Sequence, residues 1–377
     1  MLIVDAHEDI AFNILEYGRN YTRSVAETRR LEAGGKTPER NGDTLLGWPE
    51  YQRGHVAVVF GTLFVTPLRR VHDPRETQTY ADLQEAYRRY SAQLDVYHRL
   101  AGDHPDQFTL IETQGDLQGV LDAWEPLDRA EAEPAGQEEG EQREQQAPVG
   151  IVVLMEGAEG VRQPGELEEW WARGVRLIGP AWAGTRFCGG SGEPGPLTSE
   201  GFALLESMAG FGFTLDLSHM DEAAALQALD VYPGAIVASH ANARALLKGT
   251  ESNRHLTDRV IAGLLERDGV IGVVLINHFL QVGWKNGDSR EVVPLEKVAA
   301  QIDYICQMAG DARHVGLGSD FDGGFGVQSV PAGIDSIADL QKLAPLLAER
   351  GYSDQDIASV FGRNWIALLQ RTLPETV

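Results

Sequence analysis

Five apolar segments of this chain each lead to residues that can bind a metal ion. The segments 2–6, 151–155, 213–218, 235–239 and 315–319 lead to His7 with Asp9, to Glu156, to His219, to His240 and to Asp320. Each segment has the length and apolar character of a buried strand, so the ligand-type residues stand where strands end. Because His7 and Asp9 are two residues apart, they project from the same face of an extended strand. Five endings of this kind indicate one shared metal site.

Strand-like and helix-like segments alternate from residue 150 onward. The sequence predicts strands at 150–156, 175–182, 212–219, 234–240, 270–277 and 314–320, and helices at 167–173, 200–208, 221–229, 258–266, 295–308, 337–350 and 354–370. Two earlier strands, 2–9 and 55–65, bring the number to eight. This pattern predicts an α/β fold, a (β/α)₈ TIM-type barrel, in which catalytic groups gather at the carboxyl ends of the strands. A doubly wound open sheet is the alternative, but no Gly-x-Gly-x-x-Gly follows a strand to support a dinucleotide site.

Two segments interrupt the regular alternation. Residues 10–50 are polar and rich in Gly and Arg, which predicts a helix start followed by a long loop, and a helix is predicted at 77–100. Residues 125–148 are rich in glutamate and almost free of apolar side chains, so burial would not offset the entropy of ordering them. We therefore predict a disordered acidic insertion at 125–148 in a single barrel domain that spans residues 1–377.

The charge of the chain restricts its partners. Asp and Glu number 56 against 32 Lys and Arg, a formal net charge of −24, which repels phosphate backbones and anionic lipid headgroups. We therefore expect no nucleic-acid partner and no membrane partner.

No basic leader with an apolar core and no apolar run of about 20 residues occurs, which predicts a cytoplasmic protein. Cys188 and Cys306 are too few for a disulfide framework.

The residue types at the strand ends favour a particular chemistry. Imidazole and carboxylate groups suit zinc or a similar divalent ion, and a carboxylate can bridge two ions where a neutral imidazole cannot. Two ions about 3.5–4 Å apart share a hydroxide and polarise the carbonyl group that it attacks. Hydrolysis at neutral pH is the natural use of such a site, with a nearby carboxylate to move the proton to a leaving amine. Asp5 is an alternative ligand to Asp9, because it also lies two residues from His7.

Seven short stretches follow one another in an order typical of a known family. They are Asp5–Asp9, Met155–Ala158, Asp216–His219, Ser239–Arg244, Asn253–Asp258, Gly318–Gly323 and Gly362–Asn364. Together they resemble the membrane (renal) dipeptidases, a branch of the amidohydrolase-like metal-dependent barrels. Any one stretch alone is a weak signal, but the ordered set covers nearly the whole chain apart from the acidic insertion.

The resemblance implies a binuclear zinc dipeptidase that cleaves short L-Xaa-L/D-Xaa dipeptides with a metal-bridged hydroxide. The implied zinc ligands are His7 and Asp9 for one ion, His219 and His240 for the other, and Glu156 as the bridge between them. Arg254 would receive the terminal carboxylate of the substrate, because a planar guanidinium can pair with both carboxylate oxygens. Asp320 would contact the hydroxide and carry the proton to the leaving amine.

One stretch departs from the family pattern. The family has a histidine at the end of the fourth strand that touches the substrate near the scissile carbonyl, whereas residues 177–182 read Leu-Ile-Gly-Pro-Ala-Trp, so Trp182 or a neighbour takes that place. An indole donates one hydrogen bond but carries no proton charge near neutral pH. Two other functions therefore stay open: a related amidohydrolase acting on N-acyl amino acids or lactams, and a catalytically weakened barrel that binds metal or peptide.

Three further residues near the predicted site have more modest interpretations. His255 and His278 lie near strand or helix ends and are interpreted as structural or substrate-lining rather than as metal ligands. Asp322 either orients ligands or caps a turn. By analogy with families of this kind, a homodimer is a further expectation.

Overall fold

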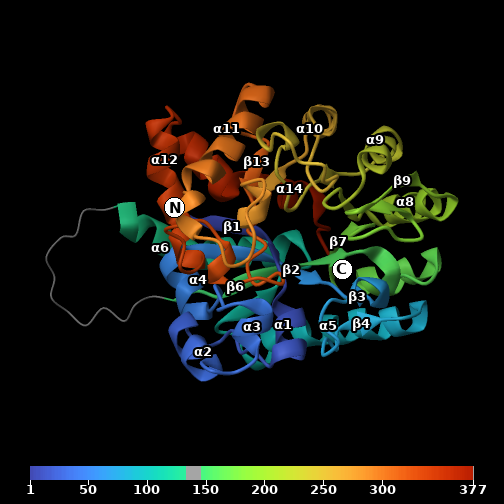
Figure 1. The fold of residues 1–377 in the computed structure, drawn as a ribbon, viewed down its shortest axis with the longest axis horizontal. Coiled ribbons are helices and arrows are strands. Elements are labelled where there is room, and N and C mark those ends of the chain that lie inside the picture. Colours follow the sequence, from blue (N-terminus) through green and yellow to red (C-terminus); the bar gives the residue numbers. More distant parts are fainter. Residues whose placement is uncertain (133–145, 377) are drawn as a thin grey trace, which may run out of the picture.

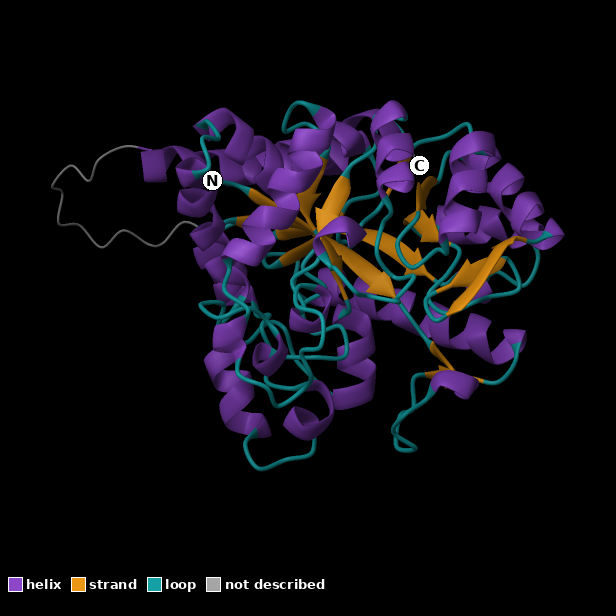
Figure 2. Cartoon of the chain, turned by 45° about the horizontal axis from the view of Figure 1, so that its top comes forward, coloured by secondary structure: helices purple, strands orange, loops and turns teal. Residues whose placement is uncertain are grey.

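Eight parallel strands form a barrel at the centre of the molecule (Figure 2). The structure is a computed structural model that describes residues 1–132 and 146–376. The barrel strands are β1 (Ile3–Glu8), β2 (Val56–Leu63), β6 (Val149–Glu156), β7 (Val175–Gly179), β10 (Thr214–Asp216), β11 (Ile236–Val237), β12 (Ile271–Val273) and β13 (Val315–Leu317). They follow the order β11-β10-β7-β6-β2-β1-β13-β12, and a parallel bridge between Ala238 and Ile271 joins the two ends. The predicted (β/α)₈ barrel is confirmed.

Helices cover the outside of the barrel (Figure 1). They are α5 (Leu83–Asp103), α6 (Gln114–Ala132), α7 (Leu167–Ala172), α8 (Ser199–Phe211), α9 (Glu222–Val231), α10 (Asp258–Glu266), α11 (Glu296–Ala309), α12 (Leu343–Glu349), α13 (Asp354–Ala358) and α14 (Asn364–Thr372). Strands β2 and β6 are buried at every residue, as their continuous apolar sequences predict. Helix α5 buries one face, including Tyr90, Leu94 and Tyr97, and begins where the Asp82 side chain accepts a hydrogen bond from the Glu85 amide.

The connection from β1 to β2 is more helical than predicted. It contains α1 (Ile10–Tyr17), α2 (Val25–Glu32), α3 (Thr37–Asn41) and α4 (Trp48–Gly54) in place of one helix start and a long loop. The local start signals are present: Ser24 caps α2, and α3 and α4 have proline in their first turn. These helices are too short to show a helical repeat of apolar residues. Only the signals at their first residues, a capping serine or a proline, distinguish them from loop sequence.

Both ends of the segment 125–148, predicted to be a disordered insertion, are part of the ordered fold. After the short strand β5 (Phe108–Leu110), which pairs with β6, helix α6 continues through Ala132, into the range predicted to be disordered. At the other end, Ala147 is buried and β6 begins at Val149. The part of the prediction that concerns residues 133–145 lies outside the described residues.

The last two predicted helices are each divided. A 3₁₀ helix at Ile337–Lys342 precedes α12, and a π turn at Ser359–Arg363 joins α13 to α14. The π turn contains Gly362, where a Cβ atom would lie 3.0 Å from the Leu2 carbonyl oxygen. The irregular turn therefore brings the last helices directly against the backbone at the start of β1.

Two glycines allow β12 and β13 to approach the end of β11. A Cβ atom at Gly272 or at Gly318 would lie 1.9 Å from the carbonyl oxygen of Ser239. A larger residue at either position would therefore displace the segment that carries His240. The strand β11 is shorter than predicted, at Ile236–Val237, and Ala238 adds one parallel bridge to Ile271.

Two small sheets lie outside the barrel. One pairs β3 (Thr66–Pro67) with β4 (Thr79–Tyr80), and the other pairs β8 (Cys188–Gly190) with β9 (Glu193–Leu197). The segments that link each pair line the same cavity as the strand-end residues. None of the helices in residues 1–132 and 146–376 combines the length and apolar character that crossing a membrane requires.

Candidate metal centre

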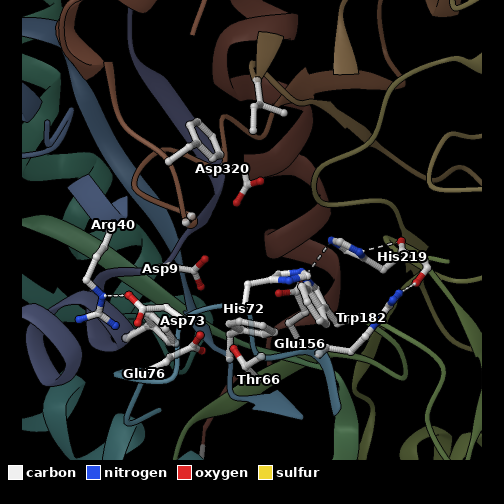
Figure 3. A pocket seen from close by; sticks show the side chains of 18 of the residues that line it. Asp9, Arg40, Thr66, His72, Asp73, Glu76, Glu156, Trp182, His219 and Asp320 are labelled. Carbon is white, nitrogen blue, oxygen red and sulfur yellow. Dashed lines mark hydrogen bonds and ion pairs between the residues drawn. The ribbon is translucent and has the colours of Figure 1, made fainter. Parts of the chain in front are cut away.

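The ligand-type residues predicted from the strand ends meet in one place (Figure 3). His7 lies in β1 and Glu156 is the last residue of β6, while His219, His240 and Asp320 follow β10, β11 and β13. Their ligand atoms form two groups, each within 4.8 Å: His7, His240 and Asp320 in one, and Glu156, His219 and His240 in the other. His240 belongs to both groups, so the two groups are adjacent.

The nitrogen and carboxylate atoms point toward a common centre. The Nε2 atoms of His219 and His240 are 3.0 Å apart and lie 3.2 and 3.4 Å from Glu156 Oε1. His7 Nε2 lies 3.9 Å from Glu156 Oε2 and 3.8 Å from Asp320 Oδ1. Glu156 therefore directs one oxygen toward each half of the cluster, as a bridging ligand would.

The outer nitrogens of two imidazoles are held by serine hydroxyls. His219 Nδ1 contacts Ser191 Oγ at 2.9 Å, and His240 Nδ1 contacts Ser239 Oγ at the same distance. Ser239 Oγ in turn donates to Asp216 Oδ2 at 2.5 Å. Such contacts fix the orientation of a ligating histidine and leave its Nε2 free to bind an ion.

Asp9 lines the same cavity but lies in neither three-residue group. Its Oδ1 atom is buried and has no hydrogen-bond partner among the described residues, and the same holds for Glu156 Oε1. Asp5 instead accepts hydrogen bonds from the backbone amide of Ser319, at 2.6 Å, and from its hydroxyl. Asp5 thus ties β1 to β13, whereas Asp9 keeps an oxygen available.

Electrostatics favour a cation at this cluster. Burial lowers the pKa of His7 to about 3 and holds the pKa values of His219 and His240 well below their usual range, so the imidazoles are neutral. Burial, then repulsion from Asp9 and Asp320, raises the pKa of Glu156 well above its usual value. Crowded carboxylates and neutral imidazoles with unpartnered atoms are a donor set that a divalent ion fits. The residues therefore fit zinc or a similar metal.

Two of these residues occupy an uncommon backbone conformation. His219 has φ 68° and Asp320 has φ 61°, in the left-handed region that residues other than glycine seldom adopt. Both residues lie three residues past the end of a barrel strand, β10 for His219 and β13 for Asp320. Strain of this kind persists only where the surrounding structure holds it, and it is common at functional sites.

Asp322 holds the loop that carries Asp320. Its carboxylate accepts hydrogen bonds from Arg19 Nη1 at 3.0 Å, the Tyr21 hydroxyl at 2.9 Å, the Thr44 hydroxyl at 2.5 Å and the Leu45 amide at 2.8 Å. These four donors come from the β1–β2 connection. The observed position supports the first interpretation of Asp322, a residue that orients its neighbours.

We expect Asp322→Asn to lower the free energy of unfolding by about 3 kcal/mol, the lower end of the usual cost of breaking a buried ion pair. The Arg19 and Asp322 side chains are both fully buried, and in the variant Arg19 loses the charge of Asp322 while it keeps Glu32, the Gly42 carbonyl and Asn13 Oδ1 as partners. Urea denaturation measures the change. Asp311→Asn is the control, because the partner of Asp311, Arg313, is largely exposed, and this variant should unfold like the parent protein.

Arg254 reaches the cavity as a buried cation. It is 4% exposed, and its Nη2 atom donates to the His240 carbonyl at 2.6 Å. Its Nε and Nη1 atoms have no hydrogen-bond partner in the described part of the chain. Burial lowers the pKa of Arg254, and the charges of Asp320 and Glu156 oppose this shift. The free edge of the guanidinium is thus available to a carboxylate inside the cavity.

The cavity around these residues has a volume of about 1030 Å³. Trp182 forms part of its wall, with its ring 5.0 Å from that of Phe64 and 6.2 Å from that of His219. His278 also lines the cavity, which agrees with the substrate-lining alternative, whereas His255 is buried against Phe279. The volume is at the upper end of the range of about 300–1000 Å³ that is usual for small-molecule sites.

Sequence reasoning missed the residues that hold this centre in place. Ser191 gave no signal, and Ser239 appeared only as the first residue of a family-typical stretch, because the role of a serine depends on contacts across the fold. The four donors to Asp322 were missed because they lie about 280–300 residues away in sequence. The only indication of these donors in the sequence was the polar composition of the β1–β2 connection, which was predicted to be mostly loop.

Comparison with known proteins identifies relatives of this chain. Residues 134–373 match the family model described as membrane dipeptidase, peptidase family M19. An uncharacterized protein in the pqqA 5′ region of Klebsiella pneumoniae is 33% identical over 58% of this chain and 81% of its own length. The dipeptidase aclJ of Aspergillus oryzae is 24% identical over 97% of this chain and 77% of its own length.

A solved structure agrees with the fold. It is a metallopeptidase from Rhodobacter sphaeroides, liganded with a phosphinate mimic of the dipeptide L-Ala-D-Ala. Its TM-score is 0.74 at 23% identity, and the alignment covers 99% of each chain. The barrel and its arrangement of helices are therefore shared over essentially the whole length.

Proposed function

Because the chain belongs to the membrane dipeptidase family, peptidase family M19, and is therefore a metal-dependent dipeptidase, we propose that it uses two zinc ions to hydrolyse L-Xaa-L/D-Xaa dipeptides. The observation that carries this proposal is the pair of adjacent ligand groups that share His240, with Glu156 facing both halves. The Rhodobacter sphaeroides relative, bound to a mimic of L-Ala-D-Ala, supports acceptance of a D-residue.

The proposed ligands are His7 and Asp9 for one ion, His219 and His240 for the other, and Glu156 as the bridge. When bound, zinc supplies Lewis-acid chemistry: it polarises a carbonyl oxygen and lowers the pKa of water. The imidazoles of these ligands are neutral and can therefore bind a cation. Ser191 and Ser239 orient two of them, those of His219 and His240. The five proposed ligands are at most 9% exposed, so the surrounding protein holds their side chains in place.

We assign Asp320 the proton transfer. Its backbone amide donates to the His7 carbonyl at 3.2 Å, which fixes the residue beside the ligands. Its side chain is 14% exposed, so one edge of the carboxylate faces the cavity. Burial and the charge of Asp9 raise its pKa well above the usual value, which favours a carboxylate able to hold a proton and release it to a leaving amine.

Arg254 is the proposed receptor for the substrate carboxylate. We expect Arg254→Met to raise KM for dipeptides about 10- to 150-fold, which corresponds to the loss of a charged hydrogen bond of about 1.5–3 kcal/mol. Steady-state kinetics measure the change, with Arg244→Met, outside the cavity lining, as the control. An unchanged KM would remove Arg254 from the substrate site.

A dipeptide panel tests the function itself. Protein reconstituted with zinc is assayed on L-Xaa-L-Xaa and L-Xaa-D-Xaa dipeptides, beside chelated protein. We expect zinc-dependent release of free amino acids and two zinc ions per chain by metal analysis. Binding of two ions without cleavage of any dipeptide would contradict the proposed substrate class.

A further inference from the structure

The cavity has a second charged wall, formed by residues outside the ligand cluster. This wall comes from α3 and from the segment between β3 and β4, and it includes Arg40, Asp73 and Glu76. Figure 3 shows these three residues on the side of Asp9, away from His219. The wall therefore belongs to the same cavity as the ligand cluster but lies apart from His219.

Most charges in this wall neutralise one another. Arg40 Nη2 lies 2.5 Å from Glu16 Oε1, and Arg40 Nε lies 2.7 Å from Asp73 Oδ2. Arg75 Nη2 lies 2.7 Å from the same Asp73 oxygen. Glu16 is further satisfied by the backbone amide of Thr77 at 2.8 Å. These contacts use two guanidinium groups and two carboxylates.

Glu76 is the carboxylate that remains. Its Oε1 atom is buried and has no hydrogen-bond partner within residues 1–132 and 146–376. Burial raises the pKa of Glu76, and the hydrogen bond to Thr66 opposes that shift. Glu16 and Asp73 add to the negative potential at this position, and Arg40 offsets only part of it. A buried, unpartnered carboxylate oxygen at a cavity wall is complementary to a cationic ligand group.

We infer that Glu76 binds a cationic side chain on the N-terminal residue of the substrate, so that the enzyme prefers dipeptides that begin with lysine or arginine. This inference rests on the proposed function. Arg254 donates to the carbonyl of His240 and would hold the carboxylate end of the substrate there. Figure 3 shows Glu76 on the side of Asp9, and we place the side chain of the N-terminal substrate residue there.

The test compares two substrates of similar shape and different charge, lysyl-alanine and norleucyl-alanine. The zinc-loaded enzyme should show a kcat/KM about 10-fold higher for lysyl-alanine, in line with one charge-assisted contact. Glu76→Gln should remove most of this preference by lowering kcat/KM for lysyl-alanine far more than for norleucyl-alanine. Glu39→Gln, at an exposed position of the same wall, should keep the parent preference. Equal losses for both substrates in Glu76→Gln, or no preference in the parent enzyme, would overturn the inference.

Calorimetric binding separates this inference from the proposed function. Lysyl-alanine and norleucyl-alanine are titrated into zinc-loaded Asp320→Asn protein, with and without Glu76→Gln. Tighter binding of lysyl-alanine that disappears with Glu76→Gln supports the inference even if no dipeptide is cleaved. The inference would be refuted, with the dipeptidase function intact, if the Asp320→Asn protein bound both dipeptides with equal affinity and the parent enzyme cleaved both with equal kcat/KM.

Discussion

Asp320→Asn is expected to lower kcat for dipeptides about 10²- to 10⁴-fold, the usual contribution of a positioned acid or base. Asparagine keeps the size of the side chain but cannot accept a proton and return it. Asp320 Oδ1 lies 3.8 Å from His7 Nε2, so the lost group stands directly beside the ligand cluster. KM should change much less than kcat, because Arg254, the proposed receptor of the substrate carboxylate, is unchanged in this variant.

The measurement pairs kinetics with metal analysis on the same samples. Asp311→Asn provides the control, since Asp311 forms an ion pair with Arg313 at the surface. A kcat close to that of the parent would exclude Asp320 as the proton carrier. Loss of zinc together with activity would instead make Asp320 a metal ligand, which its place in one three-residue group with His7 and His240 would explain.

Glu156→Gln is expected to weaken metal binding more than about 100-fold and to lower kcat/KM in parallel. Residues that merely orient a ligand contribute about 10- to 100-fold, and a bridging ligand should exceed that range. The amide replaces one charged oxygen with an NH₂ group, which cannot coordinate a cation. Glu156 faces His7 with one oxygen and both His219 and His240 with the other, so both halves of the centre should suffer.

Competition with a chromophoric chelator measures the affinity, and circular dichroism checks that the fold is retained. Glu168→Gln, an exposed position of α7, is the matched control and should bind metal like the parent. Parent-like affinity in Glu156→Gln would contradict the bridging role. Loss of one ion with the other retained would show that Glu156 belongs to a single half of the centre.

The barrel was predictable because its signal is repeated. Each strand is a continuous apolar run, and each ligand stands where such a run ends, so the amino-acid sequence alone assigns His7, Glu156, His219, His240 and Asp320 to one edge of the barrel. The boundaries were predicted less well: of the segment 234–240, only Ile236–Val237 form the strand, and Ala238 adds one bridge to Ile271. Strand length there depends on packing between strands, which local sequence does not encode.

Contacts between distant segments could not be predicted, because local sequence does not encode which segments pack together. Glu76 appeared as one charge among many, and its unpartnered oxygen emerges only once Arg40 is seen to pair with Glu16 and Asp73. Helix α6 continued past the predicted boundary at residue 125 although its composition is acidic and it contains Pro126. Composition therefore did not predict the local backbone at this end of the segment.

The network around Asp322 also has a consequence for synthesis of the protein. Asp322 and Asp320 emerge from the ribosome long after Arg19, Tyr21 and Thr44, with which Asp322 forms its hydrogen bonds. The β1–β2 connection thus lacks the common acceptor of these three donors until the final strand arrives. Nascent chains would therefore hold the earlier ligands without a finished site, and premature binding of metal or substrate would be disfavoured until translation nears its end.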